Sequence, residues 1–118
     1  MTNDILHTLS GIIQERRQAS SEKSYTKSLL EKGPEHIARK FGEEAVELVI
    51  ALCSESDKDV RGEAADVLYH MMVGLESRNI QVTEVLEELK DRMGMSGIEE
   101  KAGRPQNQAG GPANDEQD

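Results

Sequence analysis

The chain has 118 residues, the length of one domain, and 36% of them are hydrophobic, with two Tyr, one Phe and no Trp. Its formal net charge of −9 argues against a nucleic-acid binder held by phosphate contacts, which would show a basic patch. No stretch approaches the roughly 20 apolar residues of a membrane span, and the N-terminus lacks the apolar run of a signal peptide. With Cys53 as its single cysteine, the chain cannot form an intrachain disulfide, and we expect a cytoplasmic protein.

The first two predicted elements are helices. Apolar residues recur at helical spacing from Ile5 to Ile13 behind Asn3, a possible cap, which predicts a helix to about residue 19. After a polar connector, Ser24 or Thr26 can cap a second, short helix. We expect that helix to stop at the following glycine, residue 33.

The next two predicted helices are apolar almost all round and yet carry acidic residues. Pro34 suits the first turn of a helix that runs to about Leu52, and residues 54–59 then form a turn. A fourth helix runs from there to about Ser77. Because the turn is short, the two helices are predicted to be antiparallel neighbours. Helices of this composition are normally buried, and we expect Cys53 to be a small buried side chain as well.

The remainder of the chain divides into one more helix and a tail. Apolar residues at helical spacing between Val82 and Leu89 mark a fifth helix that ends near Met93. Residues 105–118 are rich in Gly, Pro, Asn and Gln, so we expect a disordered tail after a domain of residues 1–104. The predicted fold class is all-α, with four to five helices. Its apolar surface faces more than one side, which predicts a helical bundle completed by dimerisation.

Four carboxylates stand in two pairs on the third and fourth predicted helices. Glu44 and Glu47 are one helical turn apart, as are Glu63 and Asp66. A buried carboxylate without a partner is costly, so facing pairs need a cation between them. An all-oxygen ligand set favours Mg²⁺, with Mn²⁺ also possible, over zinc, which prefers His and Cys. Because Mg²⁺ often binds substrate phosphates as well, the pattern indicates phosphate chemistry.

Other interpretations of the acids stay open. A di-iron centre would use a Glu-x-x-His motif on each of two helices, whereas this chain offers Glu63-x-x-Asp66 with His70 one turn further on. The acids can instead form a solvated face, although their apolar neighbours make that arrangement unfavourable. The non-enzymatic alternative is an acidic helical adaptor that dimerises and binds metal without turnover.

The acid spacing, Glu43-Glu44-x-x-Glu47 followed after fifteen residues by Glu63-x-x-Asp66, resembles the metal motif of the all-α nucleoside-triphosphate pyrophosphohydrolase superfamily. Further motifs narrow the resemblance to the phosphoribosyl-ATP pyrophosphatase family. They are Ser24-Tyr25-Thr26, Lys40-Phe41-Gly42-Glu43-Glu44 and Ala65-Asp66-Val67-Leu68-Tyr69-His70. The likeness runs from about Asp4 to Arg104.

The resemblance implies hydrolysis of the α–β phosphoanhydride of phosphoribosyl-ATP to phosphoribosyl-AMP and pyrophosphate, the second step of histidine biosynthesis, with Mg²⁺ required. Hydrolysis of dUTP, dCTP or other nucleotides is the alternative within the superfamily. The implied partners are a small-molecule nucleotide and a second copy of the chain in a homodimer, with neither nucleic acid nor membrane. The metal requirement agrees with assigning Glu44, Glu47, Glu63 and Asp66 as metal ligands.

Three residues near the acid pairs have candidate roles. Glu43 lies about 100° round the helix from Glu44, so we expect it to hold or deprotonate the attacking water. Lys40 shares a face with Glu44, where its ammonium either contacts a phosphate or forms a salt bridge within the helix. His70 either donates to a carboxylate ligand or is a satisfied core or interface histidine.

Four further residues are candidates for substrate binding. Tyr25 and Thr26 contact the substrate by resemblance only. Lys101 and Arg104 either reach a partner subunit's phosphates or are solvated terminal charges.

Overall fold

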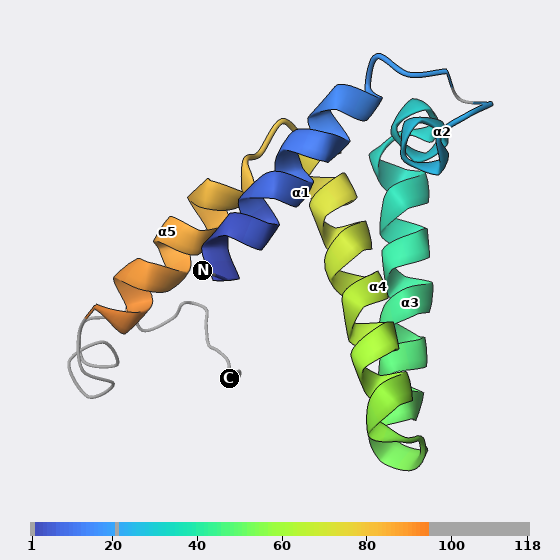
Figure 1. The fold of residues 1–118 in the computed structure, drawn as a ribbon, viewed down its shortest axis with the longest axis vertical. Coiled ribbons are helices and arrows are strands. Elements are labelled where there is room, and N and C mark those ends of the chain that lie inside the picture. Colours follow the sequence, from blue (N-terminus) through green and yellow to red (C-terminus); the bar gives the residue numbers. More distant parts are fainter. Residues whose placement is uncertain (1, 21, 95–118) are drawn as a thin grey trace. The chain divides into compact units, whose positions relative to one another are not determined.

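The structure, a computed structural model, describes residues 2–20 and 22–94. All regular structure in these ranges is helical, which confirms the predicted all-α class (Figure 1). The helices are α1 (Thr2–Arg16), α2 (Tyr25–Lys32), α3 (Pro34–Ser54), α4 (Asp57–Ser77) and α5 (Val82–Met93). The chain forms two compact units, Met1–Thr83 and Glu84–Asp118. The predicted tail, residues 105–118, and its boundary with the domain lie outside the described residues.

Local signals in the sequence set the helix ends. Ser24, rather than Thr26, caps α2, because its side-chain oxygen accepts a hydrogen bond from the Lys27 N–H at 3.1 Å. Gly33 separates α2 from α3 with a φ of +92°, a conformation that glycine adopts without steric cost, and Pro34 follows in the first turn of α3. The first helix is shorter than predicted, since residues 17–19 form a turn with i to i−3 hydrogen bonds.

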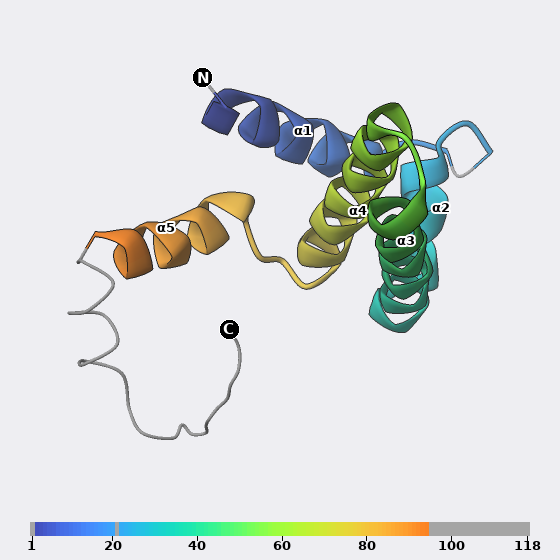
Figure 2. The same ribbon diagram turned by 90° about the horizontal axis from the view of Figure 1, so that it is seen from below.

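Helices α3 and α4 run side by side in both ribbon views (Figures 1 and 2), and only residues 55 and 56 separate them. The short connection makes them antiparallel, as predicted. The four largest fully buried side chains of the described residues come one from each of the first four helices: Ile13, Leu29, Ile37 and Val73. The core therefore lies where α1 and α2 meet the N-terminal half of α3 and the C-terminal half of α4.

A charged contact fixes the end of α1 on α4. Arg17 donates to the carboxylate of Glu76, which is only 7% exposed, and to the Glu76 backbone carbonyl. The Lys27 ammonium donates to the Arg17 carbonyl at 2.6 Å, which ties α2 to the same point. Helix α4 ends at Ser77, as the sequence predicts, and Asn79 just beyond it has a φ of +60°.

The prediction that α3 and α4 are buried is wrong for the single chain. Val46 and Val49 are each 58% exposed, Ile50 is 50% exposed, and Cys53, expected to be buried, is exposed as well. The reason is geometric: α1 and α2 cover only one end of the helix pair, so the far sides of α3 and α4 have no neighbour among the described residues of the unit Met1–Thr83. No helix of the described part is long and apolar enough to cross a membrane.

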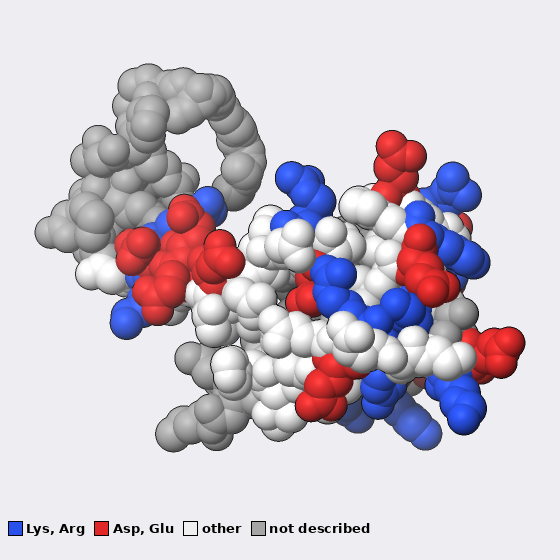
Figure 3. Space-filling model, turned by 90° about the horizontal axis from the view of Figure 1, so that it is seen from above, with Lys and Arg blue, Asp and Glu red and all other residues white. Residues whose placement is uncertain are grey.

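Most of α5 belongs to the second unit. Val85, Leu89 and Met93 recur every four residues along it and are exposed, so α5 presents an apolar stripe of its own. On the first unit, the face drawn in Figure 3 carries basic side chains interspersed with acidic ones.

Candidate active site

Three of the four predicted metal ligands converge between α3 and α4. Glu44 from α3 and Glu63 and Asp66 from α4 each offer a carboxylate oxygen, and these oxygens lie within 4.8 Å of one another. Glu44 and Glu63 are half-buried, while Asp66 is exposed. The antiparallel pairing of α3 and α4 brings the two acidic motifs face to face, as their helical spacing predicts.

Glu47, the fourth predicted ligand, is exposed and lies beside this trio. Desolvation is the largest cause that raises the pKa of Glu63, followed by repulsion from Glu47 and a hydrogen bond with Glu47. Repulsion from Asp66 and Glu44 acts in the same direction. Each of these effects disfavours the charged carboxylate, and a nearby divalent cation would oppose them.

The cluster fits a hard divalent cation. The Glu63 Oε1 atom is buried and has no hydrogen-bond partner among the described residues, although buried polar atoms normally have one. Carboxylate oxygens are the ligands that Mg²⁺ and Mn²⁺ prefer. Glu44, Glu63 and Asp66 can therefore bind a metal ion, and the unpaired oxygen is explained if it is a ligand.

Lys40 lies one turn before Glu44 on α3. Its ammonium forms an ion pair of 3.4 Å with Glu43, the residue expected to hold the attacking water, rather than with Glu44 one turn along the helix. Electrostatic interaction with Tyr25 is the largest of the influences that raise the pKa of Lys40, followed by the hydrogen bond and attraction to Glu43.

Two of the residues expected to contact substrate, Tyr25 and Thr26, pack at the start of α2 against α4. The Tyr25 ring stacks on that of Tyr69 with centroids 6.3 Å apart, and the Thr26 hydroxyl is hydrogen-bonded to that of Tyr69. Thr26 is only 6% exposed, whereas Tyr25 is 53% exposed. Burial raises the pKa of Tyr69. Sequence reasoning assigned no role to Tyr69, whose contact with Thr26 joins residues 43 positions apart.

His70 is a satisfied buried histidine, one of its two predicted roles. Its Nδ1 atom bonds to the backbone carbonyl of Asp66 at 2.8 Å, and not to a carboxylate. Its Nε2 atom lies 3.3 Å from the Tyr25 hydroxyl. The side chain, 6% exposed, therefore links the α4 turn that carries Asp66 to the first residue of α2. The last two predicted substrate contacts, Lys101 and Arg104, lie outside the described residues.

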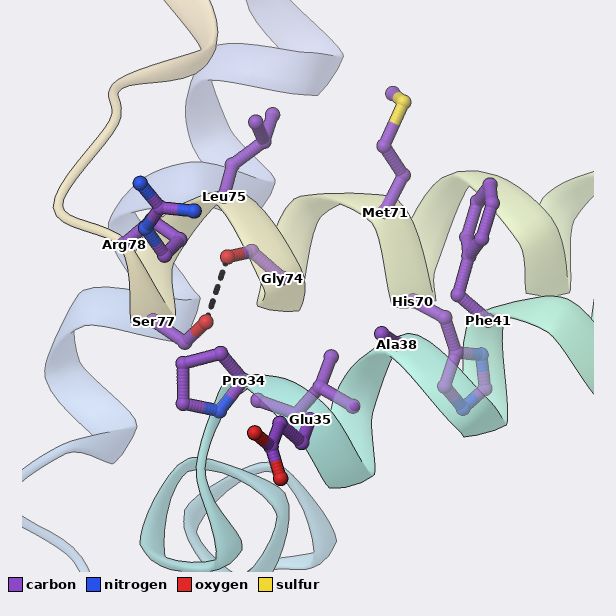
Figure 4. Close-up of a pocket in the computed structure, with 11 residues that line it drawn as sticks. Pro34, Glu35, Ala38, Phe41, His70, Met71, Gly74, Leu75, Ser77 and Arg78 are labelled. Carbon is purple, nitrogen blue, oxygen red and sulfur yellow. Dashed lines mark hydrogen bonds between the residues drawn. The ribbon is translucent and has the colours of Figure 1, made fainter.

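A separate pocket of about 390 Å³ lies between the N-terminal half of α3 and the C-terminal half of α4 (Figure 4). Its lining is mainly apolar and includes Ile37, Phe41, Met71 and Leu75. His70 also lines it, so the pocket and the Tyr25 contact meet at one side chain. The acid cluster has a different chemical character and is made of other residues.

These features define an all-α protein whose antiparallel helix pair carries a carboxylate cluster suited to a divalent cation. The chain matches the phosphoribosyl-ATP pyrophosphohydrolase family over residues 6–93, and it belongs to that family. The match includes both acidic motifs and the Ser24-Tyr25-Thr26 segment.

Several named relatives agree with this membership. The chain is 50% identical to phosphoribosyl-ATP pyrophosphatase 1 of Rhodopseudomonas palustris over 104 residues, which are 88% of this chain and 97% of the relative. It is 48% identical to the phosphoribosyl-ATP pyrophosphatase of Ruegeria pomeroyi over 86% of this chain and 96% of that protein. The enzyme of Zymomonas mobilis is 46% identical over 89% of this chain and 98% of its own length.

Proposed function

We propose that the acid cluster of α3 and α4 is the place where this chain hydrolyses phosphoribosyl-ATP to phosphoribosyl-AMP and pyrophosphate, a step of histidine biosynthesis. The family match supports the reaction. The convergence of Glu44, Glu63 and Asp66 within 4.8 Å is the observation that supports the location. Three carboxylates would repel a triphosphate by themselves, so the location requires a bound cation.

Mg²⁺ is the proposed cation, with Mn²⁺ as a substitute. Glu44, Glu63 and Asp66 would hold it, and Glu47 is near enough to Glu63 to join them. When bound, the ion would neutralise charge on the phosphate oxygens, a major contribution to phosphoryl transfer. The protein's own part is to hold the three carboxylates converged on two packed helices before the substrate arrives.

Glu43 and Lys40 provide the remaining chemistry in this proposal. Glu43 is exposed beside the cluster, where its carboxylate can hold the attacking water and accept its proton. The Lys40 ammonium, 3.4 Å from Glu43, forms an ion pair with that carboxylate and would contact a phosphate oxygen of the substrate. Tyr25 stays a predicted substrate contact, whereas the buried Thr26 contributes by holding Tyr69. Lys101 and Arg104 stay as predicted phosphate contacts.

A direct test is Mg²⁺-dependent pyrophosphate release from phosphoribosyl-ATP, assayed beside dUTP, dCTP and other nucleotides. We expect a clear preference for phosphoribosyl-ATP, and loss of turnover in Glu47→Gln and Asp66→Asn variants that remain helical. A preference for a deoxynucleotide would overturn the substrate. Unchanged turnover in both variants would overturn the site, and an inactive wild type with bound metal would favour the adaptor.

We also propose that the active form is a homodimer that covers the outer side of α3. Val46, Val49, Ile50 and Cys53 follow one another at helical spacing and are all exposed, which makes one apolar stripe. At about 100° per residue, Glu43 and Glu47 lie between this stripe and the side of α3 that faces α4. A second copy on the stripe would therefore border the acid cluster and help to close it from water.

The dimer is tested by placing charge on the stripe. Val49→Asp would bury an unpaired carboxylate in the interface, so sedimentation equilibrium should show a monomer where the wild type is a dimer. Ile5→Asp is the matched control, because Ile5 is also apolar and exposed, at 70%, but lies on α1. A monomeric wild type, or a Val49→Asp variant that still dimerises, would refute the proposed interface.

A further inference from the structure

An aromatic cluster of Tyr25, Tyr69 and His70 lies on the side of α4 that carries Asp66. Tyr69 and His70 follow Asp66 by three and four residues, so the three side chains share a face of α4. The Tyr25 ring stacks on that of Tyr69, with centroids 6.3 Å apart and planes inclined by 21°, and meets the His70 ring edge-on. The aromatic cluster therefore begins about one helical turn, roughly 5.4 Å along α4, from Asp66.

Hydrogen bonds hold the Tyr25 ring on the side toward α4. Because the Asp66 carbonyl can only accept, the Nδ1 atom of His70 donates to it at 2.8 Å, which leaves Nε2 of the neutral imidazole to accept from the Tyr25 hydroxyl at 3.3 Å. The Tyr69 ring is held in turn by the hydrogen bond between its hydroxyl and that of Thr26. His70 and Thr26 are each 6% exposed, whereas Tyr25 is 53% exposed. The Tyr25 ring is therefore supported by α4 on one side, and much of its other side is open to solvent.

A ring presented in this way can bind a flat, apolar group. Aromatic rings prefer offset stacking, and a nucleic-acid base stacks on a tyrosine without needing matched hydrogen bonds. In phosphoribosyl-ATP the phosphate and ribose groups are polar, and only the adenine base has two flat faces. When the triphosphate lies at the acid cluster, a single ribose separates the α-phosphate from the base. The base is then within reach of an aromatic cluster that begins one helical turn from Asp66.

We propose that the open face of the Tyr25 ring binds the adenine base of the substrate by stacking, and that Tyr69 is a positioning residue that holds this ring in place. The inference rests on the proposed function, since it takes the triphosphate to lie at the acid cluster. It assigns the expected substrate contact of Tyr25 to the ring and to the base, because the hydroxyl is already bonded to His70.

Steady-state kinetics of Tyr25→Leu and Tyr25→Phe separate the ring from the hydroxyl. Loss of base–aromatic stacking weakens binding by about fivefold to a hundredfold, so KM for phosphoribosyl-ATP should rise by that factor in Tyr25→Leu with kcat little changed. Tyr25→Phe should raise KM much less, because the ring remains. Inorganic tripolyphosphate, a competitor without a base, reports on the phosphate site alone. Its inhibition constant should be the same in Tyr25→Leu as in the wild type.

Tyr69→Leu tests the support behind the Tyr25 ring. We expect it to raise KM for phosphoribosyl-ATP less than Tyr25→Leu does and to leave the inhibition constant of tripolyphosphate unchanged. Adding Tyr69→Leu to Tyr25→Leu should raise KM no further, because Tyr69 acts through the Tyr25 ring. If Tyr69 only held α2 on α4, Tyr69→Leu would weaken tripolyphosphate binding as well, and the two substitutions would add.

Tyrosine fluorescence gives a readout that does not depend on turnover. The chain has two tyrosines and no tryptophan, so Tyr25 is the only tyrosine that emits in a Tyr69→Phe variant. The ligand is an analogue of phosphoribosyl-ATP with a methylene group between the α and β phosphorus atoms, added with Mg²⁺. It should quench the Tyr25 emission, because the base stacks on the emitting ring. Tyr25→Phe, in which only Tyr69 emits, is the matched control and should be quenched much less.

Three results would overturn the stacking role. Equal rises of KM in Tyr25→Phe and Tyr25→Leu would assign the contact to the hydroxyl, and weaker tripolyphosphate binding in Tyr25→Leu would indicate a general disturbance of the site. Quenching that is absent from Tyr69→Phe, or equal in Tyr69→Phe and Tyr25→Phe, would show that the base does not stack on Tyr25. If the wild type fails to hydrolyse phosphoribosyl-ATP, the proposed function is wrong, and the quenching still decides whether Tyr25 binds the base.

Discussion

The substitution Asp66→Asn should stabilise the metal-free protein while it abolishes metal binding. Asp66 has carboxylate oxygens of two other residues within 4.8 Å. Two unit charges at that distance repel by about 0.9 kcal/mol in water, so the neutral amide removes repulsion of about 1 to 2 kcal/mol at low salt. For a small domain this corresponds to a rise in Tm of roughly 4 to 8 °C per kcal/mol. A residue that destabilises the metal-free protein is expected at a site whose function requires carboxylates close to one another.

The assay is thermal unfolding followed by circular dichroism, with chelator at low salt and again with excess Mg²⁺. We expect Mg²⁺ to raise the Tm of the wild type and to change that of the variant little, so that the wild type becomes the more stable of the two. Because the Debye length falls to about 3 Å at 1 M salt, the advantage of the metal-free variant should shrink there. Asp91→Asn on α5 is the matched control. A metal-free variant less stable than the wild type, or an advantage insensitive to salt, would refute the reasoning.

Three further outcomes follow. The folded state raises the pKa of Glu63 above its ordinary value of 4.5, so ionised Glu63 destabilises the fold at pH values above that raised pKa. This destabilisation disappears as the pH falls toward 4.5. In thermal melts, acidification should therefore stabilise the metal-free wild type relative to Glu63→Gln. Ser24→Ala removes the α2 cap and should cost about 1 kcal/mol in urea unfolding. Gly74→Ala should add up to about 1 kcal/mol, because the new methyl group meets Ile37 at an ordinary 3.5 Å; a loss would contradict this spacing.

Helix periodicity and caps were sufficient to predict most of the fold. Ser24, Gly33 and Pro34 act within one or two turns of the chain, so their effect is visible in the sequence. The length of α1 was overestimated, because Arg17 leaves the helix to reach Glu76, 59 residues away. Tertiary contacts of this kind have no local signature.

The candidate site divides in the same way. The i, i+3 spacing of the acids and the short turn predicted that Glu44, Glu63 and Asp66 face one another, and the structure brings them together. The partner of Lys40 proved to be Glu43, since both i+3 and i+4 neighbours are within reach and only the packed side chains select one. The sequence does not predict the hydrogen-bond partners of His70 either, because its Nε2 atom lies beside a residue of another helix.

The sequence by itself determined that the chain is helical, that its two central helices are antiparallel and that their carboxylates meet, because each of these depends on contacts within a few turns. Only the tertiary structure decided which side of each helix is covered. The apolar residues of α3 indicated burial, yet Val46 and Val49 are exposed, since two short helices cannot surround a longer pair. The tertiary structure also decided that His70 is hydrogen-bonded to both Tyr25 and the backbone of Asp66, because the packing of α2 on α4 joins residues 45 positions apart.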